Sequence, residues 1–370
     1  MRIMEIYRSR VAKVQELLVS LDQDVMVLFL SSNMLYLSGF YDEPGERMLL
    51  FIVPREGEPI FLVPELYEQQ VKQKSPFPDV RVWKDSDDPV KLLRSAVVSF
   101  KKGRAGVLVD DGMWASFFLM LREVLHEAKY SLASRIMKSL RMRKTPEEVR
   151  NLGKAGAIAD AAFVEVAGLN IEGMTEHALS ATLEDAMTHK GAEKIAFETL
   201  VASGPNSALP HHRAGQRKIE HGDVVILDYG CRYQGYCSDI TRTVVCGASS
   251  KEVSEVYEIV KRAQDKAVHA VRPGIEAQEV DWTAREEIIR SGYGEQFIHR
   301  TGHGIGLDVH EEPYIVSGNA LELQAGMAFS VEPGIYFPGR FGVRIEDIVV
   351  VTESGAKRMN QSTHDLQIVR

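Results

Sequence analysis

Two aspartates that flank a predicted β-turn are the first residues whose types and spacing could do chemistry. Asp228 ends an apolar, β-branched run that opens at Gly222, and Asp239 begins a second such run. Two β-branched runs separated by a short turn-like segment are typical of a β-hairpin. If the turn centres on Tyr233 and Gln234, the two aspartates face each other across the strand pair. Facing carboxylates about 5 Å apart destabilise the pair unless a cation or a shared proton neutralises them.

The same arrangement recurs downstream with two glutamates. Glu332 ends the apolar run G-M-A-F-S-V-E, and Glu346 lies in V-R-I-E-D-I-V-V-V after the turn F-P-G-R-F-G. This pattern predicts a second hairpin whose acids also face each other. We therefore interpret the four acids as candidate ligands of a cation.

A histidine framed by glycines lies between the two hairpins. His303 is flanked by Gly302, Gly304 and Gly306. Glycine lets the backbone approach another group closely or take a positive φ. A phosphate-binding loop is the alternative interpretation of this spacing, but no strand–loop–helix pattern and no lysine accompany it. We therefore expect His303 to act as a ligand beside the four acids.

One imidazole and four carboxylates form a hard, oxygen-rich ligand set, which favours Mn, Co, Fe or Zn over metals selected by thiolates. Two divalent ions balance the charge of four carboxylates, whereas one ion would leave a buried site strongly negative. Two such ions about 3.5–4 Å apart hold a bridging water as hydroxide and polarise a carbonyl group. Each residue taken singly is more often a structural polar side chain than a ligand. Their combination is what predicts a dinuclear hydrolase.

The elements that must position these residues form an internal repeat. In each copy, helices precede the acid-bearing β segments, which open at Gly222 and Gly326. Asp228 and Glu332 each follow their opening glycine by six residues. Two α+β halves related by pseudo-symmetry would bring the acid-bearing strands together in one sheet. The first half starts at K-T-P-E-E, where residues 144–148 predict a helix start with a capping box.

A chain of 370 residues exceeds the usual size of a single domain. In its first third, apolar runs bounded by Pro or Gly predict buried strands of an α/β layer at 25–30, 48–54, 59–64 and 106–110. We therefore expect an α/β N-terminal domain over residues 1–135 and an α+β catalytic domain over residues 140–370.

Composition excludes some classes of function and predicts the cellular location. Apolar content of 45% and charged content of 26% are those of a soluble globular protein, and a net charge of −8 argues against a nucleic-acid-binding surface. Charges throughout the first ten residues argue against a signal peptide, and no stretch approaches the roughly 20 apolar residues of a membrane span. Cys231, Cys237 and Cys246 are too few and too clustered for a disulfide framework, so we expect free cysteines on strands. A cytoplasmic protein without nucleic-acid or membrane partners is the expectation.

Four motifs closely resemble those of the Xaa-Pro dipeptidase (prolidase) and aminopeptidase P family. They are D-Y-G…G-Y-C-S-D-I-T-R-T, G-H-G-I-G-L-D-V-H-E-E-P, F-S-V-E-P-G-I-Y and V-R-I-E-D, and the resemblance covers the chain from about Thr145 onwards. N-M-L-Y-L-S-G-F at residues 33–40 resembles the family's N-terminal domain more weakly. The resemblance implies a creatinase-like α/β N-terminal domain followed by a pseudo-symmetric metallopeptidase domain of the pita-bread fold.

The resemblance also implies a ligand set. Asp239 and Glu346 are expected to bridge two divalent metal ions, Asp228 to complete one site, and His303 with Glu332 to complete the other. The ions implied are Mn or Co, with Zn or Fe as alternatives.

The catalytic groups implied by the resemblance lie around these ligands. Glu332 would help to manage the proton of the attacking water, and His211 and His310 would stabilise the intermediate and the leaving nitrogen. Arg344, two residues before a ligand on the same strand face, would orient ligand carboxylates. His212 adjoins His211, and which of the two acts is left open.

The resulting prediction is a homodimeric hydrolase that cleaves the N-terminal residue from Xaa-Pro dipeptides. An Xaa-Pro aminopeptidase acting on longer peptides shares the same motifs and is the alternative. A methionine aminopeptidase also shares the ligands but commonly lacks a preceding domain. A metal-free hydrolase of the creatinase type or a non-catalytic binding protein should have lost ligands, whereas all five are present.

Overall fold

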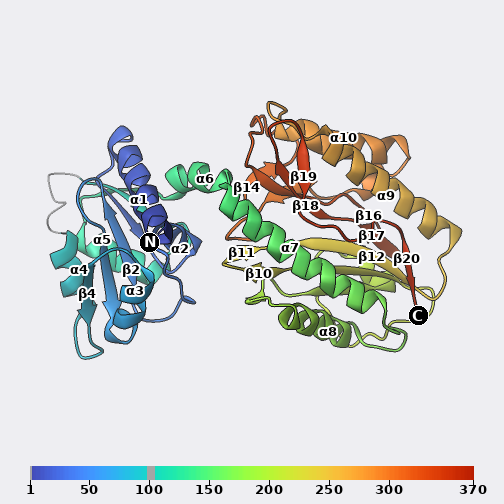
Figure 1. Cartoon of the computed structure of the whole chain (residues 1–370), viewed down its shortest axis with the longest axis horizontal. Helices are drawn as coiled ribbons and strands as arrows, with labels where there is room; N and C mark the ends of the chain where they lie inside the picture. Colours follow the sequence, from blue (N-terminus) through green and yellow to red (C-terminus); the bar gives the residue numbers. More distant parts are fainter. Residues whose placement is uncertain (1, 98–104) are drawn as a thin grey trace. The chain divides into compact units, whose positions relative to one another are not determined.

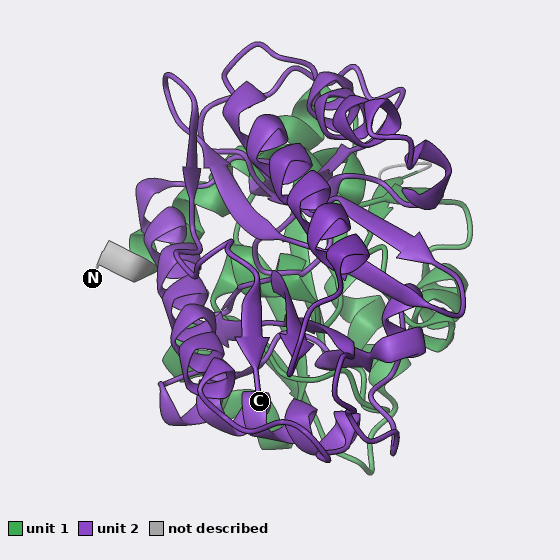
Figure 2. Cartoon of the chain, turned by 90° about the vertical axis from the view of Figure 1, so that its right-hand side faces the viewer, with its two compact units in different colours: residues 1–140 green, residues 141–370 purple. Residues whose placement is uncertain are grey.

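The structure, a computed structural model, describes residues 2–97 and 105–370. The chain divides into two compact units, Met1–Leu140 and Arg141–Arg370, which Figure 2 shows in different colours. In the part of the chain that is described, no helix is both long enough and apolar enough to cross a lipid bilayer.

A six-stranded mixed sheet forms the first unit, with strand order β4-β3-β2-β1-β5-β6. Strand β1 pairs antiparallel with β2 and parallel with β5. Each of the four predicted apolar runs forms a fully buried strand, so this expectation is confirmed. The strands are β1 (Val25–Leu28), β2 (Leu50–Pro54), β3 (Ile60–Pro64), β4 (Asp79–Trp83), β5 (Gly106–Val109) and β6 (Lys129–Leu132). The helices are α1 (Arg2–Ser20), α2 (Ser32–Ser38), η1 (Glu65–Tyr67), α3 (Glu68–Lys74), α4 (Pro89–Val97), α5 (Ala115–Val124) and α6 (Ser134–Met142).

The second unit begins with the predicted helix start. Thr145 caps α7 (Pro146–Ala167) by accepting a hydrogen bond from the backbone N–H of Glu148, at 3.3 Å. The Glu148 carboxylate accepts from the Thr145 N–H at 2.6 Å, which completes the capping box. Two of the free N–H groups of the first turn are thereby satisfied, and the prediction is confirmed.

Two α+β halves make up the second unit, as predicted, and each provides most of the residues of one of two apolar cores. The first contains α7, α8 (Glu176–His189), β7 (Lys194–Ile195), β8 (Leu200–Ser203), η3 (Gly204–Ala208), β9 (Val224–Tyr229), β10 (Cys231–Tyr233), β11 (Tyr236–Cys237) and β12 (Ile240–Cys246). The second contains α9 (Lys251–Ala270), α10 (Ala277–Arg290), η4 (Gly294–Gln296), β13 (Gly302–Gly304), β14 (Glu311–Ile315), β15 (Ala328–Val331), β16 (Gly334–Phe337), β17 (Phe341–Arg344), β18 (Asp347–Val351), β19 (Ala356–Arg358) and β20 (Gln367–Val369). In Figure 1, α9 and α10 lie above these strands and α8 lies below them. The three cysteines are free and buried on strands, as expected.

The acid-bearing strands do not lie in one sheet, and that expectation is wrong. In the first hairpin, β9 and β12 belong to the sheet β20-β12-β9-β8. In the second, β15 and β18 belong to the sheet β14-β13-β15-β18-β19, and β16 and β17 form a sheet of their own. The sheets meet where Thr241 forms an isolated antiparallel bridge with Glu346. Pseudo-symmetry therefore brings the acids together at this junction without merging the sheets.

The predicted register of the first hairpin is also wrong. Its turn centres on Gln234 and Gly235, with φ of 50° and 78°, and Asp228 pairs with Thr241 rather than with Asp239. Two-residue hairpin turns of this kind need a positive φ at both central residues, a conformation that glycine adopts easily. The correction moves the register by two positions, so both aspartates remain on one face of the hairpin.

The second hairpin has the predicted register. Val331 pairs with Asp347 on one side of the acids, and Gly334 pairs with Arg344 on the other. The same register places Glu332 opposite Glu346 in the gap between the two ladders. The expectation of facing acids is therefore confirmed for this hairpin.

Candidate metal centre

Three buried residues from three segments form the centre of the site. One ligand atom each of Asp239, His303 and Glu346 lies within 4.8 Å of the others. His303 Nε2 lies 3.7 Å from Asp239 Oδ2 and 3.3 Å from Glu332 Oε1. The structure thus brings four of the five predicted ligands into direct proximity. The fifth, Asp228, lines the same cavity and is linked to Glu346 through Arg344 and Thr241.

Close packing of glycines fixes the histidine. A side chain at Gly302 would collide with the carbonyl of Ser330, and one at Gly304 with the carbonyl of Glu312. The glycines therefore serve a close approach of backbones, which is one of the two predicted reasons for them. His303 Nδ1 lies 3.2 Å from the Gly304 carbonyl, which can only accept, so Nδ1 carries the proton and Nε2 presents its lone pair to the acids.

An unsatisfied oxygen marks the position where a cation fits. Glu346 Oε2 accepts a hydrogen bond from Thr241 Oγ1 at 2.6 Å. Glu346 Oε1 is buried and has no hydrogen-bond partner among the described residues. A buried carboxylate oxygen without a partner is costly, and coordination to a metal ion would remove that cost. The residues present therefore fit a divalent cation.

Arg344 connects the carboxylates, as its strand position predicts. Its Nη2 donates to Asp228 Oδ2 at 2.6 Å and its Nε to Thr241 Oγ1 at 3.1 Å. Its Nη1 donates to the hydroxyl of Tyr336 at 2.9 Å, and this hydroxyl lies 2.9 Å from His299 Nε2. A buried guanidinium with three such partners holds its neighbours in a defined geometry.

Burial controls the protonation states in the site. It raises the pKa of Asp239 and of Glu346 well above the ordinary range, and the charges of the neighbouring carboxylates raise these values further. Burial also raises the pKa of Glu332. It lowers the pKa of His303 and of His310 to about 4. Both imidazoles are therefore neutral near pH 7, and the acids favour either protons or a cation.

We expect the metal-free protein to lose stability as the pH rises above about 6.5. The raised pKa values of Asp239 and Glu346 stabilise the fold below the unfolded-state value of about 4, and this contribution is lost as the pH rises through the folded-state values. The lowered histidine values oppose the trend only below about pH 6.5. Thermal unfolding in the presence of EDTA measures the effect. Wild type should lose stability with pH more steeply than Asp239→Asn, and equal slopes would contradict the expectation.

A cavity of about 460 Å³ is lined by the four acids and by several histidines, among them His211, His212, His303 and His310. His310 packs against His303 with ring centroids 4.1 Å apart and the ring planes tilted by 45°, and His211 lines the same cavity. His212 is occupied differently, because its Nε2 lies 2.8 Å from Glu176 Oε2. This geometry favours His211 over His212 as the histidine that faces a ligand in the cavity.

Sequence reasoning missed the residues that support the loop carrying His211 and His212. The fully buried Glu176 carboxylate also accepts hydrogen bonds from the N–H and hydroxyl of Ser203 and from Asn206. It holds the His212 segment, and therefore the neighbouring His211. Tyr336 was missed as well, although it lies within the motif E-P-G-I-Y. The match between G-M-T-E at residues 173–176 and its repeat was the one signal that could have pointed to Glu176.

Comparisons with known proteins identify the family of the chain. The family "Metallopeptidase family M24" matches residues 150–353, and "Creatinase/Prolidase N-terminal domain" matches residues 10–143. An Xaa-Pro dipeptidase of Lactobacillus helveticus is 37% identical over 360 residues, which cover 96% of this chain and 98% of that protein. A prolidase structure from Thermococcus sibiricus is 42% identical with a TM-score of 0.94, covering 97% of this chain and 98% of that chain. An X-Pro aminopeptidase structure from Thermotoga maritima is 34% identical with a TM-score of 0.87, covering 97% and 99%.

Proposed function

The chain belongs to metallopeptidase family M24, and on that premise we propose that it is an Xaa-Pro dipeptidase that depends on two divalent metal ions. The predicted family resemblance and the fold class are confirmed: a creatinase N-terminal domain precedes an M24 catalytic domain. The observation that carries the proposal is the buried cluster of Asp239, His303 and Glu346 with its unpartnered carboxylate oxygen.

Charge supports two ions rather than one. Asp228, Asp239, Glu332 and Glu346 all line one cavity, and Arg344 is a buried cation that also lines it and pairs with Asp228. One divalent ion would leave this group of charges negative, whereas two make it slightly positive. A slight positive charge favours the negative charge that develops on a peptide carbonyl oxygen during hydrolysis. Mn or Co is the proposed identity of the ions, with Zn or Fe as alternatives.

Each side chain of the site would have a distinct role around the ions. Bound ions would activate a water molecule and polarise the scissile carbonyl. Asp239 and Glu346 lie at the centre and would contact both ions, Asp228 would complete one site, and His303 and Glu332 the other. Glu332 would also accept and return a proton, since burial raises its pKa towards the range where a carboxyl group can do so.

Two histidines and Arg344 would act on the substrate and on the ligands. His310 and His211 would donate N–H groups to the developing oxyanion and to the leaving proline nitrogen, because an imidazole carries at least one N–H donor. Arg344 would hold Asp228 and, through Thr241, Glu346 in place.

The preference for proline rests on relatives named Xaa-Pro dipeptidase and prolidase. Activity on longer peptides is the second candidate, because a relative named X-Pro aminopeptidase has the same fold at 34% identity. A homodimer in the cytoplasm completes the proposal, and size-exclusion chromatography with light scattering together with cell fractionation tests that part.

Metal removal and substrate choice test the proposed function. We expect hydrolysis of Ala-Pro that stops after dialysis against EDTA and returns with Mn²⁺ or Co²⁺, because activation of water requires the ions. Elemental analysis of the active protein should find two ions per chain.

Two further peptides separate the alternatives in the same assay. Faster turnover of Ala-Pro-Ala than of Ala-Pro would identify an aminopeptidase, and turnover of Met-Ala alone would identify a methionine aminopeptidase. Loaded protein that cleaves none of the three would favour a binding protein and overturn the proposal.

A further inference from the structure

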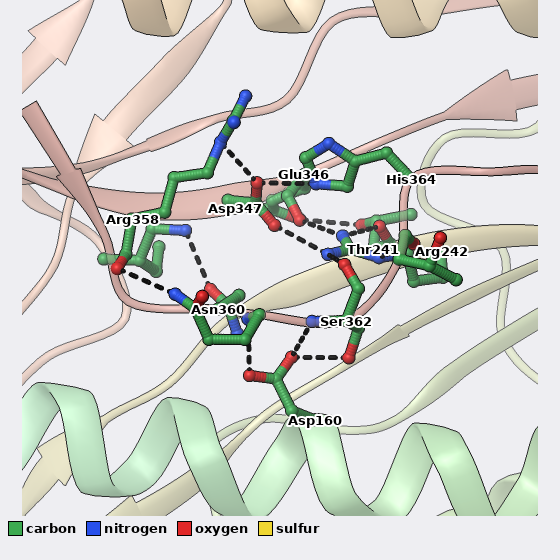
Figure 3. Close-up of polar contacts among 12 residues, drawn as sticks. Asp160, Thr241, Arg242, Glu346, Asp347, Arg358, Asn360, Ser362 and His364 are labelled. Carbon is green, nitrogen blue, oxygen red and sulfur yellow. Dashed lines mark hydrogen bonds and ion pairs between the residues drawn. The ribbon is translucent and has the colours of Figure 1, made fainter.

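A fully buried arginine contacts the backbone of Glu346, a candidate metal ligand. Arg242 is 1% exposed, and Figure 3 shows its guanidinium between Asp347 and the segment that carries Ser362. A guanidinium has five N–H groups, and five acceptors surround this one. They are the carbonyls of Thr363 at 3.1 Å, Thr241 at 2.9 Å, Glu346 at 2.6 Å and Ser362 at 3.0 Å, and Asp347 Oδ1 at 2.8 Å.

These contacts clamp the junction between the two halves. Thr241 and Glu346 form the bridge that joins the sheets, and the Glu346 N–H donates to the Thr241 carbonyl at 3.1 Å. Arg242 Nη1 donates to the carbonyls of both residues. The backbone of Glu346 is therefore held from both sides, while its carboxylate is fixed by Thr241 Oγ1.

Asp347 supplies the counter-charge on the opposite face of the strand. Its carboxylate is fully buried and also contacts His364 at 2.8 Å, Arg358 at 3.1 Å and Gln264 at 3.2 Å. Because neighbouring strand residues point to opposite faces, anchoring Asp347 also fixes the direction of the Glu346 side chain.

The segment of residues 360–365, called the C-terminal segment below, is itself anchored to two helices. Asp160 on α7 accepts hydrogen bonds from the N–H groups of Gln361 and Ser362 and from the Ser362 hydroxyl. Tyr257 on α9 donates to the carbonyl of His364 at 3.1 Å. The carbonyls of Ser362 and Thr363, which accept hydrogen bonds from Arg242, are therefore held at fixed positions.

We propose that Arg242 is a positioning residue for the metal ligand Glu346, and that the C-terminal segment, remote in sequence, forms part of this device. The proposal rests on the metallopeptidase function proposed above. A positioning role differs from a purely structural one. A buried arginine with only a structural role would affect the stability of the fold without changing the metal affinity of the folded protein. Outer partners of metal ligands commonly change metal affinity by about 10–100-fold when they are replaced.

The central test is cobalt binding to the metal-free full-length protein carrying Arg242→Lys. Lysine keeps the charge next to Asp347 but has only three N–H donors and no fork, so it cannot hold both bridge carbonyls together with the C-terminal segment. We expect Co²⁺ affinity, from titration calorimetry, to fall on the order of 10-fold, and the visible absorption bands of bound cobalt to change. A folded variant with wild-type cobalt affinity and spectrum would overturn the proposal.

The matched control is Arg217→Lys. Arg217 also pairs with a carboxylate, Asp223, and donates to a carbonyl, that of Lys218, but it contacts none of the candidate ligands. It should lose thermal stability while it keeps wild-type cobalt affinity. An equal loss of cobalt affinity in this control would show that general destabilisation explains the effect, which would also overturn the proposal.

Asp160→Ala covers the case in which Arg242→Lys does not fold. This change releases the C-terminal segment without touching a buried ion pair, and we expect a smaller loss of cobalt affinity in the same direction. Unchanged cobalt affinity and spectrum in the folded Asp160→Ala protein would then reject the device. Hydrolysis of Ala-Pro is scored separately: wild type that binds cobalt but cleaves no peptide rejects the proposed function, whereas the cobalt data still decide the role of Arg242.

Discussion

Asp239→Asn should abolish hydrolysis of Ala-Pro, with a loss of kcat/KM on the order of 10³-fold or more. Asp239 lies within ligand distance of both His303 and Glu346, so its loss affects both proposed metal positions. Metal activation of water and carbonyl contributes several kcal/mol to such reactions, and each 1.36 kcal/mol corresponds to a factor of ten in rate. Elemental analysis should find fewer than two ions per chain, measured together with the initial rate on Ala-Pro.

Asp110→Asn is the matched control for this prediction. Asp110 is also a buried aspartate, 4% exposed, and burial also raises its pKa, but it lies in the first unit and accepts a hydrogen bond from Ser31. We expect its variant to retain both ions and activity near that of wild type. Wild-type turnover and metal content in Asp239→Asn would contradict the assignment of the site itself.

His310→Ala should lower kcat by about 10²–10³-fold while both metal ions stay bound, since loss of one donor to a developing oxyanion typically costs this much. Its ring packs against that of His303 at a tilt of 45°, and burial keeps it neutral by lowering its pKa to about 4. A neutral imidazole can donate an N–H to the carbonyl oxygen without adding positive charge near the ions. Steady-state kinetics on Ala-Pro at saturating Mn²⁺, with elemental analysis of the same sample, separates kcat from metal loss.

His212→Gln serves as the comparison for His310→Ala. A glutamine amide can keep the hydrogen bond to Glu176, so the rate should change only a few-fold. A loss in His212→Gln as large as that in His310→Ala would assign the catalytic contact to His212 instead. A His310→Ala protein that is inactive because it has lost its metal would make His310 a support of the metal centre rather than a group that acts on substrate.

Local sequence patterns predicted much of the fold. The capping box at Thr145 and Glu148 and the buried strands of the first unit depend on neighbouring residues, and short-range geometry decides them. Facing acids at Glu332 and Glu346 followed from the second hairpin in the same way. The predicted register of the first hairpin was wrong because its turn could be centred in two ways, and the positive φ of Gln234 is not evident from its side chain.

The candidate ligands could be predicted from the sequence because four acids and a glycine-framed histidine gathered in one site carry a negative charge that few arrangements other than bound cations neutralise. The sequence by itself therefore determined which residues could hold metal, the family they indicate and the hydrolytic chemistry. Only the tertiary structure decided how the residues meet: the bridge of Thr241 to Glu346, the hold of Glu176 on His212, and the position of Arg242 between Asp347 and the C-terminal segment. These contacts join residues more than thirty positions apart, and in most cases more than a hundred. Packing of the whole domain selects them, and no local pattern of side chains encodes them.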